Sequence, residues 1–159
     1  MTIAGAGAAR ITFQIEALLQ DFDGQPSEEF YNRARALALT IRSVGCFAGV
    51  CLAPDTPVSV IEPLVAAADI DLVDVLTVLP GIGGQSFRPD MLEKVRALRK
   101  GHPDLPYIMV DGGIDAATAL QAAEAGANVL VSGSYLFGAP HEMASRIRRL
   151  EDVLCQQGD

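Results

Sequence analysis

Short apolar runs alternate along the chain with longer stretches that have a helical pattern of apolar and charged residues. The apolar runs are rich in Val, Ile and Leu, which is typical of strands that are buried on both faces of a parallel sheet. They cover residues 10–15, 47–52, 72–78, 107–110 and 129–131. Because a helical stretch follows each run, the sequence predicts about five βα units around a parallel sheet.

The clearest predicted helix covers residues 89–100. Its apolar positions recur at the spacing of one helix face, with charged residues between them. These positions are Met91, Leu92, Val95 and Leu98. Gly101 and then Pro103 follow, and both residue types are typical of a helix end.

Two more helices are predicted after the fourth and fifth strands. One begins after Asp115 and covers residues 116–125, and Gly126 suits the left-handed turn that ends a helix. The other covers residues 140–155. We find no linker, low-complexity tract or repeat, so residues 1–159 are expected to form a single domain.

The length of the chain limits the architecture. An eight-unit (β/α) barrel needs about 250 residues, or roughly 31 per unit, so 159 residues accommodate about five units. The pattern therefore fits either an α/β fold that is an incomplete TIM barrel or an open, doubly wound sheet. The order of apolar and polar residues does not separate these two architectures.

The overall charge excludes some partners. The net charge is −8 and the pI is about 4.6, whereas a surface that binds nucleic acid or an anionic membrane needs clustered Lys and Arg. No apolar run reaches the roughly 20 residues of a membrane span, and the N-terminus lacks the basic and then apolar order of a secretory signal. We therefore expect no nucleic acid or membrane partner and a cytoplasmic location.

The three cysteines give no sign of a metal site or a disulfide framework. Cys46 and Cys51 have no zinc-ligand spacing and no histidine near them in sequence. We expect both to be reduced and structural. Cys51 lies inside an apolar run, which predicts a small core residue.

Glycine-rich turns follow three successive predicted strands. The turns contain Gly81, Gly83 and Gly84, then Gly112 and Gly113, and finally Gly133 with Ser134. The carboxyl ends of parallel strands form the edge where ligands bind, and backbone N–H groups in such loops bind phosphate. Glycine lets the backbone approach phosphate oxygens because it has no Cβ. Three such turns together predict a phosphate site.

Asp111 is the strongest catalytic candidate, because it ends the fourth apolar run directly before two glycines. A carboxylate there can act as a base or a metal ligand, or it can accept N–H groups of the following turn. Glu16 and Asp55 follow the first and second strands and are expected to be turn or surface residues. His102 and His141 lie in polar connections at the opposite end of the units, so we expect them to be solvated and not catalytic.

Several motifs carry a resemblance to a known family. The chain contains LPGIGGQSF at residues 79–87, VDGGI at 110–114 and EAGAN at 124–128 before Gly133 and Ser134. Upstream of these lie ITFQIEA at 11–17 and LAPDTP at 52–57. In order and spacing the chain resembles ribulose-phosphate 3-epimerase over nearly its whole length, from the family's strand four to its strand eight.

The resemblance implies an eight-stranded barrel that interconverts D-ribulose 5-phosphate and D-xylulose 5-phosphate. A proton moves at the carbon next to the carbonyl, between two aspartates on opposite sides of the substrate. A divalent metal ion (zinc, iron, manganese or cobalt) is held by two histidines and the same aspartates. Asp111 matches the later aspartate, as catalyst and metal ligand. The residues that match the substrate and phosphate loops are Gly81, Gly83, Gly84, Gly112, Gly113, Gly133 and Ser134.

The chain departs from the family pattern at several places. The family's first three strands, with the other aspartate and both histidines, have no counterpart, so only one metal ligand is retained. Gln14 stands where the family usually has a histidine, and Leu79 replaces a usually polar residue. We therefore expect the isolated chain to be inactive unless the missing strands complete it.

Two other functions remain open. The chain could be a catalytically inactive sugar-phosphate-binding or assembly module, or it could be a barrel that binds a different sugar phosphate. Unpaired edge strands expose N–H and C=O groups, and an incomplete barrel exposes its interior. The fold therefore predicts a homo-oligomer or a partner chain that covers the open edges.

Overall fold

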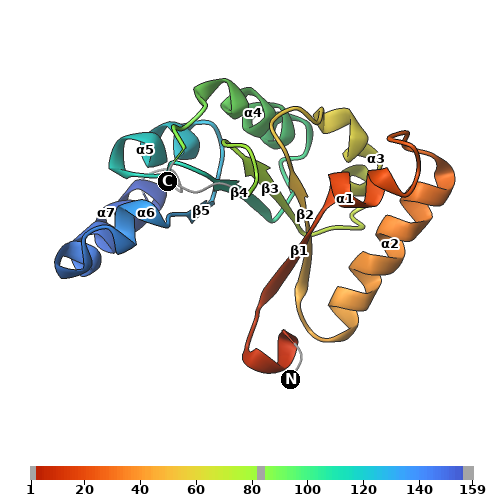
Figure 1. Ribbon diagram of the computed structural model, residues 1–159, viewed down its shortest axis with the longest axis horizontal. Helices are drawn as coiled ribbons and strands as arrows, with labels where there is room; N and C mark the ends of the chain where they lie inside the picture. Colours follow the sequence, from red (N-terminus) through yellow and green to blue (C-terminus); the bar gives the residue numbers. More distant parts are fainter. Residues whose placement is uncertain (1–2, 82–84, 156–159) are drawn as a thin grey trace.

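Five strands form one parallel sheet in the computed structural model, which describes residues 3–81 and 85–155 (Figure 1). The strands are β1 (Arg10–Gln14), β2 (Phe47–Leu52), β3 (Leu72–Leu76), β4 (Tyr107–Asp111) and β5 (Val129–Val131). Their order across the sheet is their order in the chain. A doubly wound sheet reverses its strand order at a switch point, and this sheet does not. The architecture is thus an α/β fold compatible with an incomplete TIM barrel.

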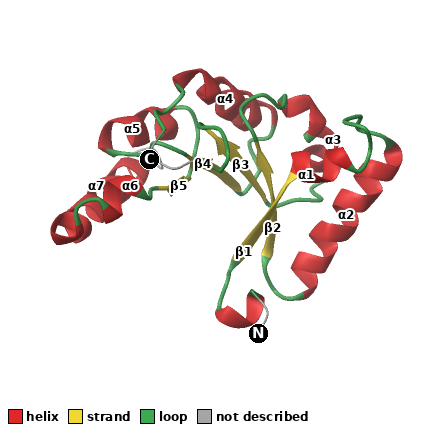
Figure 2. Ribbon diagram, viewed as in Figure 1, coloured by secondary structure: helices red, strands yellow, loops and turns green. Residues whose placement is uncertain are grey.

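The helices follow the strands around one side of the sheet, in an arc that leaves the other side without helices (Figure 1, Figure 2). They are α1 (Ile15–Gln20), α2 (Glu28–Ser43), α3 (Glu62–Ala66), α4 (Leu92–Gly101), α5 (Ala116–Glu124), α6 (Ser134–Phe137) and α7 (Met143–Cys155). Short 3₁₀ turns lie at Ala4–Ala6, Val58–Val60, Pro89–Met91 and Pro140–Glu142. The predicted helices are confirmed, although two of them begin with a 3₁₀ turn. Among the described residues, no helix has the length and apolar character needed to cross a membrane.

The hydrophobic core lies between the sheet and the helices. Val50 and Val73 are neighbours in the sheet register and are fully buried on the helix side. The predicted apolar face of α4 is buried in the same core cluster, through Leu92, Val95 and Leu98. Burying such side chains contributes about 2 kcal/mol each. The core fixes the strands, and their carboxyl ends then position the loops that follow.

Local signals in the sequence set the helix ends. Asp115 caps α5 by accepting hydrogen bonds from the amides of Ala117 and Thr118, and the Thr118 hydroxyl accepts in return from the Asp115 amide. Gly126 has a φ of +108°, and a Cβ there would lie 2.8 Å from the Arg99 side chain. Only glycine fits this turn, as the sequence predicts.

The side of the sheet away from the helices is concave and partly open. Near its amino-terminal end the rings of Phe47 and Tyr107 meet edge to face, with 5.3 Å between centroids. The Arg10 guanidinium lies 4.3 Å from the centre of the Tyr107 ring. In the described sheet β1 pairs only with β2, and β5 only with β4. The described sheet is therefore not closed, and Phe47 and Val131 are exposed near its edges.

Candidate active site at the carboxyl ends of the strands

The carboxyl ends of the strands open into a cavity of about 530 Å³, a size typical of small-molecule sites. The structure places these candidate site residues in its lining: Gly81, Asp111, Gly112, Gly113, Gly133 and Ser134. A second cavity of about 500 Å³ adjoins it and shares Gly113 and Ser134. Gly83 and Gly84 lie outside the described residues. The described candidates thus come from three loops and meet around one space.

The turn after β4 requires its two glycines because of packing. Gly112 has a φ of +119°, and a Cβ there would lie 2.6 Å from the Val78 side chain. Gly113 has a φ of +62°, and its Cβ would lie 2.8 Å from the backbone nitrogen of Phe87. A Cβ on Gly133, in contrast, would meet nothing within 4 Å. The same holds for Gly81, so Gly81 and Gly133 leave open space beside their backbone at the cavity.

Hydrogen bonds from the neighbouring strands hold the Asp111 turn in place. Thr77 is fully buried, its amide donates to the Asp111 carbonyl over 2.8 Å, and its hydroxyl lies 3.0 Å from the same oxygen. On the other side, the Ser132 hydroxyl donates to the Ile114 carbonyl over 2.7 Å. The Asp111 carboxyl is half-buried, and this burial raises its pKa.

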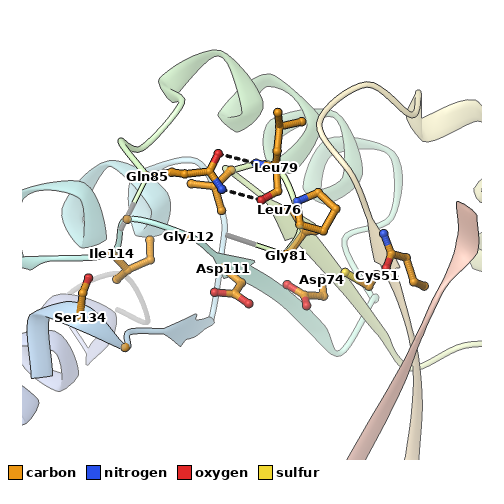
Figure 3. Close-up of a pocket in the computed structure, with 15 residues that line it drawn as sticks. Cys51, Asp74, Leu76, Leu79, Gly81, Gln85, Asp111, Gly112, Ile114 and Ser134 are labelled. Atoms are coloured by element: carbon orange, nitrogen blue, oxygen red, sulfur yellow. Dashed lines mark hydrogen bonds between the residues drawn. The ribbon is translucent and has the colours of Figure 1, made fainter. Parts of the chain in front are cut away.

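The loop after β3 is held by a side chain of its own. Gln85 donates from Nε2 to the Leu79 carbonyl over 2.6 Å and accepts from the Leu79 amide over 3.3 Å (Figure 3). This pair of bonds fixes the two ends of the turn that contains Gly81. Gln85 is thus a positioning residue within the motif that carries the family resemblance.

Asp74 is a cavity residue that sequence reasoning missed. It lies in the middle of β3, is only 5% exposed, and lines the cavity beside Asp111 (Figure 3). Burial raises the pKa of Asp74 to about 7, the charge of Asp111 adds to the rise, and the hydrogen bond with Cys51 opposes it. The signal was an aspartate inside an apolar strand, where a buried charge is costly.

The prediction that Cys51 is a small residue of the hydrophobic core is wrong, because Cys51 faces the cavity. Cys51 is half-buried, lines the cavity, and hydrogen-bonds to Asp74. Burial and the nearby Asp74 carboxyl raise the pKa of the thiol, so it stays protonated at neutral pH. Cys46 is buried and free, and its thiol donates to the Ala8 carbonyl over 3.1 Å.

The loop after β2 lies outside the cavity lining and is held from two helices. Lys94 of α4 donates from Nζ to the carbonyls of Ala53, Pro54 and Thr56 over 2.6–2.9 Å. Glu16 of α1 accepts from the Ala53 amide over 2.9 Å. Glu16 therefore holds this loop from a half-buried position in α1, and the expectation that it is a turn or surface residue is wrong.

Replacing Lys94 with methionine is expected to lower the free energy of unfolding by about 2 kcal/mol, because three carbonyls lose a charged donor while the alkyl chain is kept. Lys100→Met, on the exposed side of the same helix, is the matched control and is expected to change little. Urea unfolding of both variants measures the difference. Equal stability of the two would show that the Lys94 bonds contribute nothing.

The remaining polar candidates lie away from the cavity lining. Asp55 is exposed, 3.8 Å from the Arg88 guanidinium. His141 is exposed, as expected. The expectation that His102 is solvated is wrong, because its side chain is only 17% exposed and its Nε2 lies 2.7 Å from Glu62 Oε1. Its partner is 40 residues away in sequence, so the contact has no local signal.

The described residues do not fit the divalent metal ion that the resemblance implies. No group of three or more His, Cys, Asp or Glu side chains among them is placed to hold a metal ion. Asp111 is the one residue there that the sequence resemblance matches to a family ligand. We therefore derive no chemical step through a metal ion.

The chain is similar in sequence to one family of known proteins over most of its length. The model of the ribulose-phosphate 3 epimerase family matches residues 3–137. The chain belongs to the ribulose-phosphate 3-epimerase family. This membership confirms the resemblance that rests on the glycine turns and on the Asp111 motif.

Individual epimerases match over most of the chain. The cytoplasmic isoform of ribulose-phosphate 3-epimerase from Oryza sativa is 45% identical over 150 residues, which are 92% of this chain and 60% of the rice protein. The Schizosaccharomyces pombe epimerase is 43% identical over 92% of this chain and 58% of its own length. The Bacillus subtilis epimerase is 47% identical over 62% of this chain and 46% of its own. The chain thus spans about 60% of the length of the first two relatives.

Proposed function

We propose that the chain forms the phosphate-binding part and one acid/base face of a ribulose-phosphate 3-epimerase, which interconverts D-ribulose 5-phosphate and D-xylulose 5-phosphate. The observation that carries this proposal is the convergence of Asp111 with the glycine turns on one cavity. The family membership and the names of the relatives support the same reaction.

The geometry suits binding of a phosphate beside a base. The N–H groups in the first turn of a helix have no partner inside that helix, and α6 begins at Ser134 on the cavity. We assign the phosphate to the turns at Gly113 and Ser134, where the two cavities meet. The carbon chain then extends toward Asp111, whose raised pKa brings its carboxylate closer to the basicity that proton abstraction at neutral pH requires.

Inversion of a carbon centre needs two groups on opposite faces. Asp111 takes the proton from the carbon next to the carbonyl, and the electron pair moves to the carbonyl oxygen to form an enediolate. A second acid then returns a proton to the opposite face of the same carbon. Asp111 supplies one face, so we expect the chain alone to give no turnover. The second group would come from further βα units that pair with the free edges of β1 and β5.

A chimera tests this function. The part of the rice epimerase that this chain does not match is fused ahead of the chain, and turnover of D-ribulose 5-phosphate is followed by a coupled assay. We expect the chimera to be active and the chain alone to be inactive. Turnover by the chain alone would overturn the assignment of one face to Asp111. A folded but inactive chimera would overturn the proposed function.

The open edges of β1 and β5 lead us to propose association with a second copy or with a partner chain. Phe47 and Val131 are exposed near these edges. Association would remove their apolar surface from water, which is favourable. Sedimentation velocity at micromolar concentration is expected to show a species larger than the monomer. A clean monomer across a range of concentrations would contradict this.

A cytoplasmic location, the expectation from the sequence, remains a proposal. It is supported by the name of the rice relative, which is a cytoplasmic isoform. Fractionation of cells that express the tagged chain would test it, and recovery in an organelle would contradict it.

A further inference from the structure

A row of polar side chains crosses the concave face of the sheet below the rim. Gln14, Cys51 and Asp74 are neighbours in the register of β1, β2 and β3. All three line the larger cavity. Asp74 pairs in register with Met109, so Asp111 lies two residues nearer the rim on the next strand. The cavity therefore has a polar floor next to the base assigned above.

Asp74 has an oxygen that the folded chain leaves without a partner. Within the described residues, the buried side-chain oxygens that lack a hydrogen-bond partner are Glu16 Oε2 and Asp74 Oδ1. Of these two residues, Asp74 lines the cavity. A buried polar atom without a partner typically costs about 1–3 kcal/mol, and such atoms in folded proteins call for an explanation.

The Asp74 side chain is directed into the cavity, where it could contact a ligand. Its carboxyl group lies next to that of Asp111, and Cys51 lies on its other side (Figure 3). The Cys51 thiol hydrogen-bonds to the carboxyl, and Oδ1 remains for a group that enters the cavity. Cys51, Asp74 and Asp111 are not placed to hold a metal ion together, nor is any other group of three such side chains among the described residues, so a hydroxyl group suits this position better than a metal ion.

We propose that Asp74 is a further substrate-contacting residue of this site, and that its Oδ1 hydrogen-bonds to a hydroxyl group of an open-chain sugar phosphate. This inference rests on the proposed function, which places the phosphate on the glycine turns. It adds a contact at the other end of the ligand. In this proposal Asp74 binds the hydroxyl-bearing carbon chain, and the turns bind the phosphate.

Binding measurements on the whole chain separate these two contacts. The probes are D-ribulose 5-phosphate and inorganic phosphate, and their affinities are measured at one pH by calorimetry. Asp74→Leu removes the hydrogen-bonding group at similar size. We expect it to weaken binding of the sugar phosphate about tenfold, as loss of one hydrogen bond does, and to leave inorganic phosphate unchanged. Asp74→Asn keeps an oxygen in place and is expected to restore most of the affinity.

A second variant tests the phosphate end. Gly133→Val places a larger side chain where the cavity is open, and it is expected to weaken both probes. Circular dichroism and thermal unfolding confirm that each variant is folded.

The outcomes distinguish the two proposals. If inorganic phosphate binds and Asp74→Leu leaves the sugar phosphate affinity unchanged, the role of Asp74 is wrong and the proposed function stands. If Asp74→Leu weakens both probes equally, Asp74 shapes the cavity as a whole and does not contact the hydroxyl, which also overturns the inference. If the wild-type chain binds neither probe, the phosphate site itself is wrong and both proposals fail.

Discussion

Asp74→Asn is expected to stabilise the folded chain by roughly 4 kcal/mol above pH 7. Burial raises the pKa of Asp74 to about 7 from an ordinary value of 3.8, with a further contribution from the Asp111 charge. Each pH unit between the two values costs about 1.4 kcal/mol when the folded chain ionises. Asparagine has nearly the same shape and carries no charge to bury, so the cost disappears.

The sign of the pH dependence follows from where the proton is held. Between about pH 4 and pH 7 the unfolded chain has lost the Asp74 proton while the folded chain keeps it. Stability from this group is therefore fully present below pH 4 and falls as the pH rises to about 7. The raised pKa of Asp111 acts in the same direction. Asp71 and Asp115, whose pKa values are lowered, act in the opposite direction and below pH 4.

Urea unfolding of wild type and Asp74→Asn at a series of pH values from 4 to 8 isolates the contribution of Asp74. The difference between them is expected to be small at pH 4 and to grow with pH until about pH 7. The exposed Asp104→Asn is a control that should leave the curve unchanged. A difference that does not depend on pH would show that Asp74 is ionised at no cost.

The strands and the main helices could be predicted because their signals are local. The apolar face of α4 and the glycine after α5 mark the positions of these helices in the sequence. Each signal involves only a few neighbouring residues. The small differences are at the ends, where β4 extends to Asp111 and α4 begins after a 3₁₀ turn. The order of the strands was not available from the pattern, because strands buried on both faces show no alternation that identifies a neighbour.

The candidate site was only partly predictable for the same reason. The glycine turns and Asp111 follow strands directly, so their place at the rim could be predicted from local sequence. Asp74 and Cys51 lie inside apolar runs, and only the pairing of β2 with β3 brings them together. The contact of His102 with Glu62 also joins distant segments. Contacts between segments that are far apart in the chain depend on the tertiary fold, which the local sequence pattern does not specify.

Asp111→Asn in the active chimera is expected to lower kcat by about a thousandfold, within the range that a lost general base costs. Asparagine keeps the size of the side chain and its place at the end of β4, but it cannot accept the proton from carbon. The cavity and the glycine turns remain, so binding of D-ribulose 5-phosphate is expected to change only a few-fold. The effect should therefore fall on kcat and leave KM nearly the same.

Asp55→Asn is the matched control, because Asp55 is an exposed carboxylate that follows β2 and lies outside the cavity lining. Its kcat is expected to stay within about twofold of the parent chimera, as for most exposed positions away from the chemistry. A coupled assay of both variants at saturating substrate measures the difference in kcat. If Asp111→Asn kept a tenth or more of the parent kcat, another group would remove the proton. The carboxylate beside the glycine turns would then serve binding alone.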